Sequence, residues 1–427
     1  MSLPTVEAAP ALDGLARRYR EVRERTEWLC APLSTEDQTA QSMPDASPAK
    51  WHRAHTTWFF ETFVLRPSHA GYRPLDERYT YLFNSYYNAV GPQYFRPHRG
   101  LVTRPGVAAV GEYRAHVDRA MTELLAGRAP LRTEVPAGVV ELGLNHEEQH
   151  QELILTDVKH LLAHNPTWPA YRDVASAPAG TPVGATDWQS GPEGICEIGH
   201  GGRGFAFDNE GPRHKVFLQG FALARRPVTV GEYLDFIADG GYRRPELWLS
   251  DGWRVVQERG WEAPLYWVEE GGARRAFTLG GLTALDPAEP VCHVSYYEAD
   301  AYARWAGARL PSEAEWEVVA AGRPVAGNFL ESGRGHPAPV DAAADLAPIY
   351  GDVWMWTQSA YLPYPGYRPP SGAIGEYNAK FMSGQMVLRG GSCATPRGHI
   401  RATYRNFFPP DTRWQFSGIR LARDAAG

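Results

Sequence analysis

The chain has 427 residues, about three times a common domain size, and this length predicts two or three domains that each bury a core. Its composition, 43% hydrophobic and 22% charged, excludes a disordered chain, and 43 glycines with 35 prolines exclude a coiled coil over most of the length. The net charge is −6, and no apolar run approaches the roughly 20 residues of a membrane span. We therefore expect a small-molecule partner, with neither nucleic acid nor a membrane, and no particular oligomeric state is predicted.

The N-terminal residues and the cysteines indicate the compartment. Residues 1–7 lack the basic and apolar regions of a secretory signal, which predicts a cytoplasmic protein. Cys30, Cys196, Cys292 and Cys393 lie far apart without C-x-x-C spacing, so we expect neither a disulfide framework nor a thiolate metal cluster.

Residues 10–165 have the apolar periodicity of helices. Four helices are predicted, around Leu12 to Leu29, from Ser47-Pro48 through Phe63, over Val107 to Leu125 and over Val135 to His164. A long loop over residues 78–105 separates the second helix from the third. Four helices with one long connection predict a bundle, in which metal sites usually lie between facing helices.

The sequence pattern changes after this bundle. Residues 166–194 are rich in Pro, Ala, Gly, Thr and Ser and predict a linker. Residues 195–427 predict a loop-rich α+β domain, because short β-like runs alternate with glycine-rich turns. The clearest elements there are β-like runs at 214–218 and 385–389, helices at 230–238 and 296–306, and a helix capped by Ser312 with Glu315.

Histidines interrupt the inward stripe of the fourth helix. His146 and His150 lie one turn apart on one face, a spacing that suits two ligands of one metal ion. His52 or His55 on the second helix offers a third nitrogen, and their spacing alone does not choose between them. The pair His160 and His164 has the same spacing, but its place near the helix end favours an interaction with the helix dipole.

The same helix also matches a second motif. Residues 146–150 read H-E-x-x-H, in which Glu147 would be the general base of a zinc hydrolase. The extended motif requires glycine and histidine where this chain has Leu153 and Thr156. A zinc hydrolase therefore remains an alternative interpretation.

Four sequence blocks in the second half carry a family resemblance. They are WAGARLPSEAEWE at 305–317, GDVWMWT at 351–357, RGGS at 389–392 and GIRLA at 418–422. In order and spacing they resemble the formylglycine-generating enzyme (sulfatase-modifying factor) domain, which has a C-type-lectin-like fold. The WHxxHT block and the H-x-x-x-H helix of the first half resemble a DinB-like four-helix bundle. The combination resembles the iron-dependent sulfoxide synthases of ergothioneine biosynthesis.

One departure from the formylglycine-generating enzymes affects the expected chemistry. Those enzymes bind copper with a pair of C-terminal cysteines, whereas no second cysteine follows Cys393 here. Copper chemistry is therefore not expected, and the resemblance implies that this domain forms a wall of the substrate pocket.

The resemblance implies a mononuclear non-haem Fe(II) site with His55, His146 and His150 as ligands. Three neutral imidazoles would leave positions for a thiolate, an imidazole nitrogen and O2, and the thiolate would supply the charge that a carboxylate gives in other iron oxygenases. The implied reaction joins L-cysteine to hercynine, the trimethylated histidine, and gives hercynylcysteine sulfoxide.

The resemblance also implies residues that hold hercynine. Its trimethylammonium group needs an aromatic cavity, with Phe407 and Phe408 as first candidates and Trp356 and Trp414 as further ones. Gln149 and Asn406 match positions used around the carboxylate. Packing of the aromatic rings, and amides bonded to the backbone, are the alternative interpretations.

The resemblance also implies a tyrosine as the proton donor near the iron. Tyr87 is the first candidate and Tyr86 the second. Tyr377, which lies in the other domain, is the third. Arg96 and Arg99 lie in a Pro/Gly-rich loop and could fork onto a substrate carboxylate, although a solvated loop explains them equally well.

The thiol donor is expected to be free L-cysteine. The branch of the family that uses γ-glutamylcysteine carries Trp-Asp where this chain has Phe407-Phe408. γ-Glutamylcysteine remains the alternative donor. A non-catalytic lectin-like binding protein with a structural metal bundle is the alternative from another functional class.

Overall fold

The computed structural model describes residues 12–174, 180, 184–339 and 348–425, and its contacts group the chain into two units. The first unit consists of Met1–His164, Arg203–Phe205 and Pro370–Tyr377, and the second of Asn165–Gly202, Ala206–Pro369 and Asn378–Gly427. None of the described helices combines the length and the hydropathy that crossing a lipid bilayer requires.

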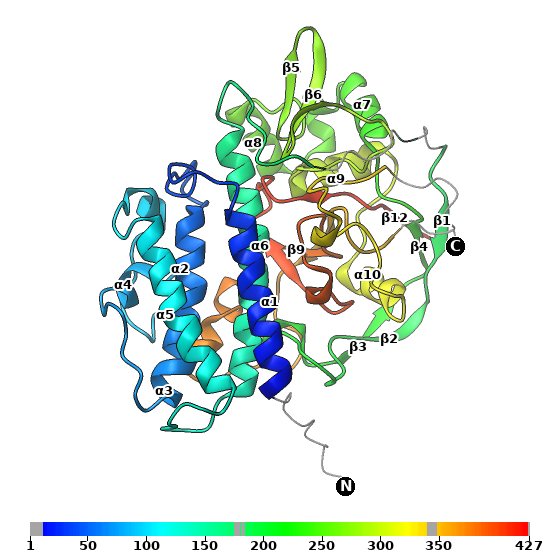
Figure 1. Ribbon diagram of the computed structural model, residues 1–427. Helices are drawn as coiled ribbons and strands as arrows, with labels where there is room; N and C mark the ends of the chain where they lie inside the picture. Colours follow the sequence, from blue (N-terminus) through cyan, green and yellow to red (C-terminus); the bar gives the residue numbers. More distant parts are fainter. Residues whose placement is uncertain (1–11, 175–179, 181–183, 340–347, 426–427) are drawn as a thin grey trace. The chain divides into compact units, whose positions relative to one another are not determined.

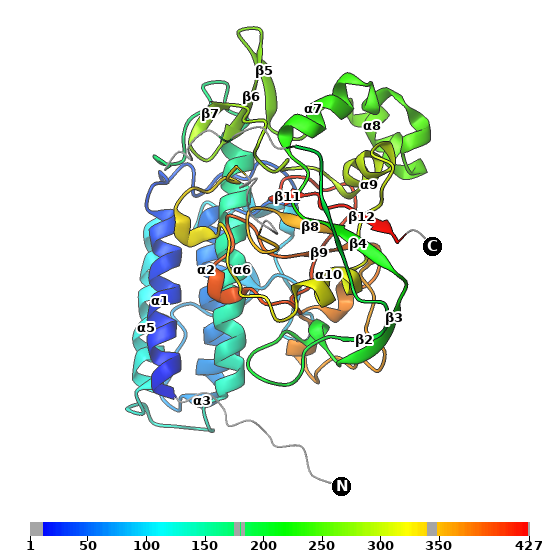
Figure 2. The ribbon, with the colours of Figure 1, turned by 90° about the vertical axis from the view of Figure 1, so that its right-hand side faces the viewer.

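Four long helices form the first unit and stand side by side in Figures 1 and 2. They are α1 (Leu12–Cys30), α2 (Ala49–Phe60), α5 (Val107–Leu125) and α6 (Ala137–Leu162). α1 packs against α5 and α6, and α2 packs against the same two helices, which is the arrangement of a four-helix bundle. The buried face of α1 includes Leu15, Tyr19, Val22 and Leu29, the apolar stripe of the sequence.

Shorter helices occupy the connection between α2 and α5. A π-helical turn over Glu61–Leu65 continues α2 into α3 (Arg66–Ser68), and α4 (Tyr79–Phe83) and a 3-10 helix over Arg96–Leu101 lie in the predicted long loop. The sequence predicted that α2 starts at Ser47-Pro48, and the helix begins after Pro48 without a side-chain cap. The Ser47 amide instead donates to Oδ2 of Asp157 on α6, at 2.8 Å.

Charged groups are buried inside the bundle. Glu147 of α6 accepts hydrogen bonds from Arg23 Nη1 at 2.9 Å, Arg114 Nη2 at 3.0 Å and the Thr26 hydroxyl at 2.7 Å. Burial alone would raise the pKa of Glu147, but the two guanidinium groups and these hydrogen bonds lower it overall. Glu147 thereby links α6 to α1 and α5 as a charged carboxylate.

The second unit contains several small sheets. One has the strand order β1-β4-β12 and a second the order β10-β9-β8-β11, in which only the β11–β8 pair is parallel. A two-stranded sheet pairs β2 with β3, and the last has the order β5-β6-β7. The strands are β1 Trp188–Ser190, β2 Gly194–Ile198, β3 His214–Leu218, β4 Phe221–Ala224, β5 Trp267–Glu270, β6 Ala273–Thr278, β7 Gly281–Ala284, β8 Trp354–Ala360, β9 Met386–Arg389, β10 Asn406–Phe408, β11 Ser417–Gly418 and β12 Ala422–Asp424.

Helices of this unit agree in part with the sequence prediction. The structure contains α7 (Val230–Ala238), α8 (Ser250–Arg259), α9 (Tyr296–Trp305) and α10 (Glu313–Ala320). The predicted capping box of α10 is confirmed, since Ser312 and Glu315 exchange side-chain to backbone bonds of 3.1 and 2.7 Å. α8 was not predicted, because its buried face consists of only Gly252, Val255 and Val256 and gives a weak periodic signal.

The described part of the predicted linker, residues 166–194, includes structure of its own. β1 pairs with β4 in antiparallel register, and the Tyr171 amide donates to the Leu279 carbonyl at 2.8 Å. Residues 175–179 and 181–183 of this linker lie outside the described residues. The fold class is confirmed: a helical bundle is followed by a unit of small sheets, short helices and many turns.

Candidate metal centre and active site

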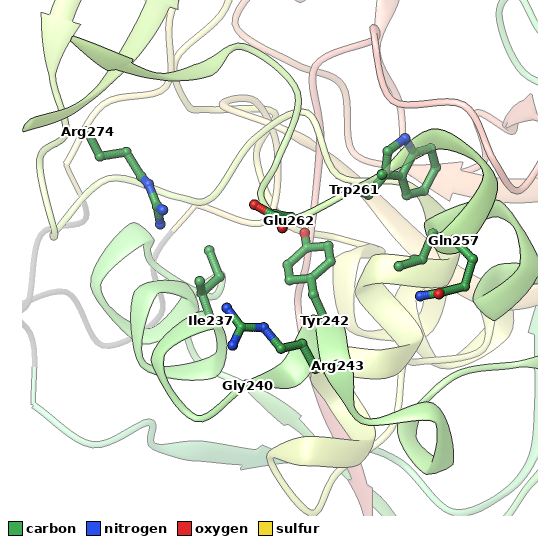
Figure 3. A pocket seen from close by; sticks show the side chains of 10 residues that line it. Ile237, Gly240, Tyr242, Arg243, Gln257, Trp261, Glu262 and Arg274 are labelled. Atoms are coloured by element: carbon green, nitrogen blue, oxygen red, sulfur yellow. The ribbon is translucent and has the colours of Figure 1, made fainter.

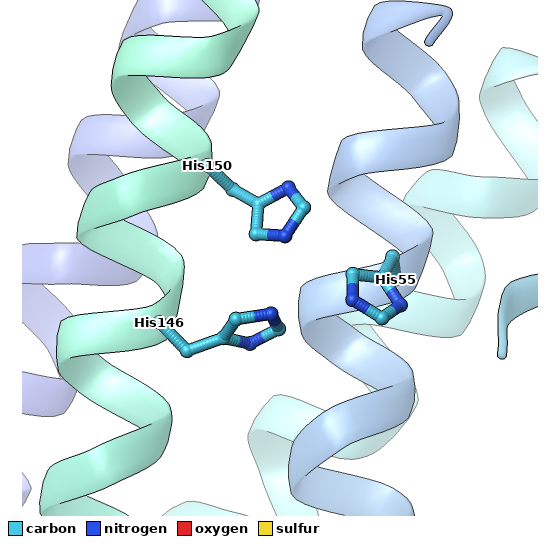
Figure 4. Close-up of side chains that lie close together, drawn as sticks. All are labelled: His55, His146 and His150. Atoms are coloured by element: carbon cyan, nitrogen blue, oxygen red, sulfur yellow. The ribbon is translucent and has the colours of Figure 1, made fainter. Parts of the chain in front are cut away.

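Three histidines converge between α2 and α6. His55 comes from α2, and His146 and His150 come from consecutive turns of α6, as Figure 4 shows. One nitrogen of each ring lies within 4.8 Å of the others. The described residues contain no second group of three His, Cys, Asp or Glu side chains that meets this criterion. Of the two candidates on α2, His55 therefore belongs to the group and His52 does not.

The ring nitrogens of this histidine group have the bonding pattern of metal ligands. His55 Nδ1 donates to the Phe83 carbonyl at 2.6 Å, which leaves Nε2 to face the group. Within the described residues, His55 Nε2 and both ring nitrogens of His146 are buried without a hydrogen-bond partner. Buried polar atoms without partners are costly, and a bound cation would compensate one nitrogen of each ring.

Burial keeps these imidazoles neutral. It lowers the pKa of His146 to about 3, and it lowers the pKa of His55 and His150 well below the ordinary value. Neutral imidazole is the form that binds a metal ion. Three nitrogen donors suit iron, zinc, copper or nickel better than magnesium or calcium, so the residues present fit a mononuclear transition-metal site.

A tyrosine from the second half of the sequence lies beside the histidine group. Tyr377 belongs to Pro370–Tyr377 of the first unit, and its ring centroid is 5.6 Å from that of His146. Its hydroxyl donates to Oε1 of Gln149, the residue of α6 that precedes His150. The structure thus brings Gln149 and Tyr377, two of the predicted site residues, next to the histidines.

Two further tyrosines complete a tyrosine cluster, defined here as Tyr86, Tyr87 and Tyr377. The rings of Tyr86 and Tyr87 stack at 4.7 Å, and Tyr86 meets Tyr377 edge-on at 6.5 Å. Tyr87 is fully buried and packs on Trp58 at 5.6 Å, while Trp58 stacks on His55 at 5.5 Å. Burial raises the pKa of Tyr87 well above its ordinary value, so its hydroxyl keeps its proton.

Hydrogen bonds from backbone amides to a side-chain carboxylate hold the two tyrosine-bearing segments together. The Glu376 carboxylate accepts from the amides of Asn88 at 3.0 Å and Ala89 at 2.8 Å. Inside the loop, Asn84 accepts from the Tyr87 amide and donates to its carbonyl, both at 3.1 Å. Sequence reasoning missed both residues. Asparagine in a turn is a usable signal for Asn84, whereas Glu376 acts on a segment far away in the sequence and gives no local signal.

The two predicted arginines have different surroundings. Arg99 is buried, with its guanidinium carbon 3.3 Å from the centroid of the Trp51 ring, and its Nη1 donates to Ser47 Oγ at 2.9 Å. Trp51 in turn stacks on His55, with ring centroids 4.6 Å apart. Arg96 is exposed and donates to the Asp45 carbonyl. Among the residues that the structure describes, the two guanidinium groups therefore share no hydrogen-bond partner.

Asn406, Phe407 and Phe408 form β10 in the second unit. Phe407 stacks on Tyr361 with centroids 4.0 Å apart, and Phe408 meets Trp414 edge-on at 5.9 Å. The Asn406 side chain accepts from the Phe407 amide at 2.9 Å. Each of the three is half-buried. Trp356, by contrast, is fully buried and donates to the Val294 carbonyl, so it is part of the core.

The second unit also has a cavity of about 270 Å³, seen in Figure 3. Tyr242, Arg243, Trp261, Glu262 and Arg274 are among the side chains that line it. None of the predicted site residues is among them, and Glu262 is exposed. We assign no function to this cavity.

Comparison with known proteins gives two family matches. Residues 18–154 match the DinB superfamily, and residues 185–344 and 331–425 match the sulfatase-modifying factor enzyme 1-like domain. Both resemblances drawn from the sequence motifs are confirmed.

The chain is similar over nearly its whole length to two curated proteins. It is 33% identical over 450 residues to the hercynine oxygenase of Mycolicibacterium thermoresistibile, with 98% of this chain and 96% of that protein covered. It is 33% identical over 446 residues to the hercynine oxygenase of Mycolicibacterium smegmatis, with 97% and 99% covered. The formylglycine-generating enzyme of Mycobacterium tuberculosis is 30% identical over 276 residues, which cover 51% of this chain and 92% of that enzyme.

Proposed function

The chain belongs to the hercynine oxygenase family, the sulfoxide synthases of ergothioneine biosynthesis, and from this premise we propose a reaction and a set of roles for its residues. The reaction joins the sulfur of L-cysteine to C2 of the hercynine imidazole and consumes O2. One C–H and one S–H bond break, one C–S bond forms, one oxygen atom enters the sulfoxide and the other leaves as water.

His55, His146 and His150 are the proposed ligands of a mononuclear Fe(II). The observation that carries this assignment is the convergence of three buried neutral imidazoles whose facing nitrogens at His55 and His146 lack partners in the described structure. Bound Fe(II) supplies the redox chemistry with O2 and favours the thiolate form of the thiol. Because the three ligands are neutral, the thiolate of the substrate brings the negative charge to the site.

Gln149 is proposed to bind the hercynine carboxylate. Its carbonyl oxygen accepts from the Tyr377 hydroxyl, and this bond directs the NH2 end of the amide to be the donor. Gln149 follows His146 on α6 by three residues, so it lies on nearly the same face of the helix.

The tyrosine cluster is proposed to hold the proton that the reaction requires. The sequence favoured Tyr87, with Tyr86 second. The contact of the Tyr377 ring with His146 favours Tyr377 as the proton donor, and the stacked pair Tyr86 and Tyr87 as its support. The raised pKa of Tyr87 agrees with a phenol that stays protonated until a base draws the proton.

Asn406, Phe407 and Phe408 are also proposed to recognise hercynine. A trimethylammonium group cannot donate a hydrogen bond and is held by aromatic faces. Phe407 and Phe408 are half-buried and so offer aromatic surface, and the Asn406 amide offers donors. The Phe407-Phe408 pair also supports L-cysteine over γ-glutamylcysteine, because the resemblance places Trp-Asp there in the branch that uses the dipeptide. Arg96 and Arg99 stay candidates for the thiol carboxylate.

The geometry does not favour a zinc hydrolase. In that mechanism Glu147 would activate a water molecule beside the two helix histidines. Glu147 instead bonds to Arg23, Arg114 and Thr26 inside the bundle. A carboxylate held by two guanidinium groups is a poor base. Membership of an oxygenase family also excludes the non-catalytic lectin-like alternative.

Oxygen consumption tests the proposed function. The protein is purified anaerobically, loaded with Fe(II) and given hercynine with either L-cysteine or γ-glutamylcysteine while O2 uptake and product mass are followed. We expect uptake only with both substrates, a sulfoxide product, and a higher kcat/KM for L-cysteine. His146→Ala should abolish uptake, whereas His160→Gln on the same helix should not. Iron-loaded protein that consumes no O2 with either thiol would refute the proposal, and peptide cleavage by the zinc form would favour the hydrolase.

A further inference from the structure

A chain of buried hydrogen bonds connects the histidine group to a carboxylate. His52 Nε2 lies 3.0 Å from Asp157 Oδ2, and His52 Nδ1 lies 2.7 Å from His150 Nδ1. Asp157 and His150 lie two turns apart on α6, and His52 lies one turn before His55 on α2. All of these side chains are buried. We call Asp157–His52–His150 the outer relay.

The hydrogen-bonding capacities of neutral imidazoles assign one direction to the outer relay. Oδ2 of Asp157 accepts from the Ser47 amide and from His52, so Nε2 of His52 carries a hydrogen. A neutral imidazole that is protonated at Nε2 has a lone pair at Nδ1. The short contact between the two Nδ1 atoms then requires the hydrogen on His150, and Nε2 of His150 is left with its lone pair for a metal ion.

The outer relay, which supports His150, differs from the hydrogen bond that supports His55, the ligand on α2. His55 Nδ1 donates to the Phe83 carbonyl, which is a neutral backbone acceptor. His150 donates to an imidazole that is itself bound to a carboxylate. A carboxylate behind a ligand histidine fixes its tautomer and ring orientation and makes the coordinating nitrogen a stronger donor.

We propose that Asp157 and His52 are positioning residues that fix the tautomer of His150 and strengthen its Nε2 as a metal ligand. The proposal rests on the proposed metal site and adds the residues that tune it. His52, which the metal group itself does not use, thereby has a function. Asp157 also fixes the start of α2 through the Ser47 amide, so one carboxylate positions both ligand-bearing helices.

Metal binding by two variants of the full chain tests the outer relay. Asp157→Asn keeps an oxygen acceptor but loses the charge, and His52→Leu removes the hydrogen bonds to both partners. Each is titrated anaerobically with Co²⁺, followed by visible absorption, and with Fe²⁺ against a competing chelator. We expect affinity to fall roughly 10- to 100-fold, with the larger loss for His52→Leu. His160→Gln is the matched control, since His160 lies one turn beyond Asp157 and its ring bonds to Ser42 Oγ at 2.7 Å.

Proton NMR of the Co²⁺ form separates tuning from a merely structural role. The wild type should show metal-shifted, solvent-exchangeable lines from the Nδ1 protons of His55 and His150. In Asp157→Asn the His150 line should move or exchange faster while the His55 line stays in place. A general loosening of the fold would change both lines.

The outcomes distinguish the relay from the site that it supports. Histidine-bound Co²⁺ in the wild type, with unchanged affinity and unchanged lines in both variants, would overturn the relay and leave the metal site standing. A wild type without histidine-bound metal would overturn the proposed function itself. Circular dichroism checks that each variant is folded, and His52→Leu carries the test if Asp157→Asn is not.

Discussion

At the scale of single residues, we expect the hydroxyl of Tyr377 to decide whether the oxidation gives a sulfoxide or a sulfinate. Tyr377→Phe keeps the ring contact with His146 but removes the bond to Gln149 and the nearby proton. Without that proton we expect the thiol to react alone with O2 to a sulfinate, and sulfoxide formation to fall on the order of 10²- to 10⁴-fold. Tyr87→Phe should shift the products in the same direction but less, since the Tyr87 ring packs among Phe59, Phe63 and other aromatic rings and not on a proposed ligand.

Mass spectrometry of the products measures the ratio of sulfoxide to sulfinate. Tyr81→Phe serves as the control, because Tyr81 is 44% exposed on α4. An unchanged ratio of sulfoxide to sulfinate in Tyr377→Phe would remove it from the proton-donor role. A larger change in Tyr87→Phe than in Tyr377→Phe would return that role to Tyr87, the residue that the sequence favoured.

Residue types predicted the metal group but not its surroundings. The i, i+4 pair of His146 and His150 follows from helix periodicity alone. The choice between His52 and His55 needs the tertiary structure, because both rings are buried on α2 and both lie close to His150. The place of Tyr377 beside His146 also depends on a contact between segments that are far apart in the sequence.

At the scale of elements, Glu147 joins three helices of the bundle. Glu147→Ala leaves Arg23 and Arg114 buried without this carboxylate, and breaking a buried ion pair from one side costs about 3–5 kcal/mol of unfolding free energy. Denaturant unfolding followed by helical circular dichroism measures the loss. The folded fraction should still bind Co²⁺, because Glu147 directs its hydrogen bonds to Arg23, Thr26 and Arg114 and not to a proposed ligand.

Glu141→Ala on the same helix is the control for that experiment. Its pair with Arg18, at 3.5 Å, is partly exposed, and such pairs contribute at most about 1 kcal/mol. Equal losses in the two variants would show that the buried network does not stabilise the bundle as argued. Loss of metal binding in folded Glu147→Ala would instead place the carboxylate in the site.

Elements with a continuous apolar stripe were predicted to within a few residues. The helix over Val107–Leu125 has the bounds that the periodicity gave, and so does that over Val230–Ala238. α8 and β1 were missed, because one has a narrow buried face and the other spans only Trp188–Ser190. Periodicity therefore predicts an element more reliably when the element buries a larger apolar face.

At the scale of the whole molecule, the chain returns to its first unit after leaving it. Arg203–Phe205 and Pro370–Tyr377 group with the helical residues, although the family match to the bundle ends at residue 154. The second of these segments carries Tyr377 and Glu376, so the candidate site draws residues from both halves of the sequence. The predicted boundaries could not show this, because the returning segment is short and has no periodicity.

Metal binding should stabilise one unit of the molecule selectively. All three proposed ligands lie on α2 and α6, and a ligand that binds only the folded form stabilises it by about 2.7 kcal/mol at 100 times its Kd. Hydrogen exchange of the full chain with and without Co²⁺ measures this region by region. Some amides of α2 and α6 exchange only when their unit unfolds. Their exchange should slow roughly 100-fold, because a stabilisation of about 2.7 kcal/mol corresponds to that factor in rate.

Amides of β8 and β9 should keep their exchange rates, and His146→Ala should abolish the effect of Co²⁺. Equal slowing in the strands would mean that the two units unfold together, and no slowing in the wild type would mean that the histidine group does not bind the metal.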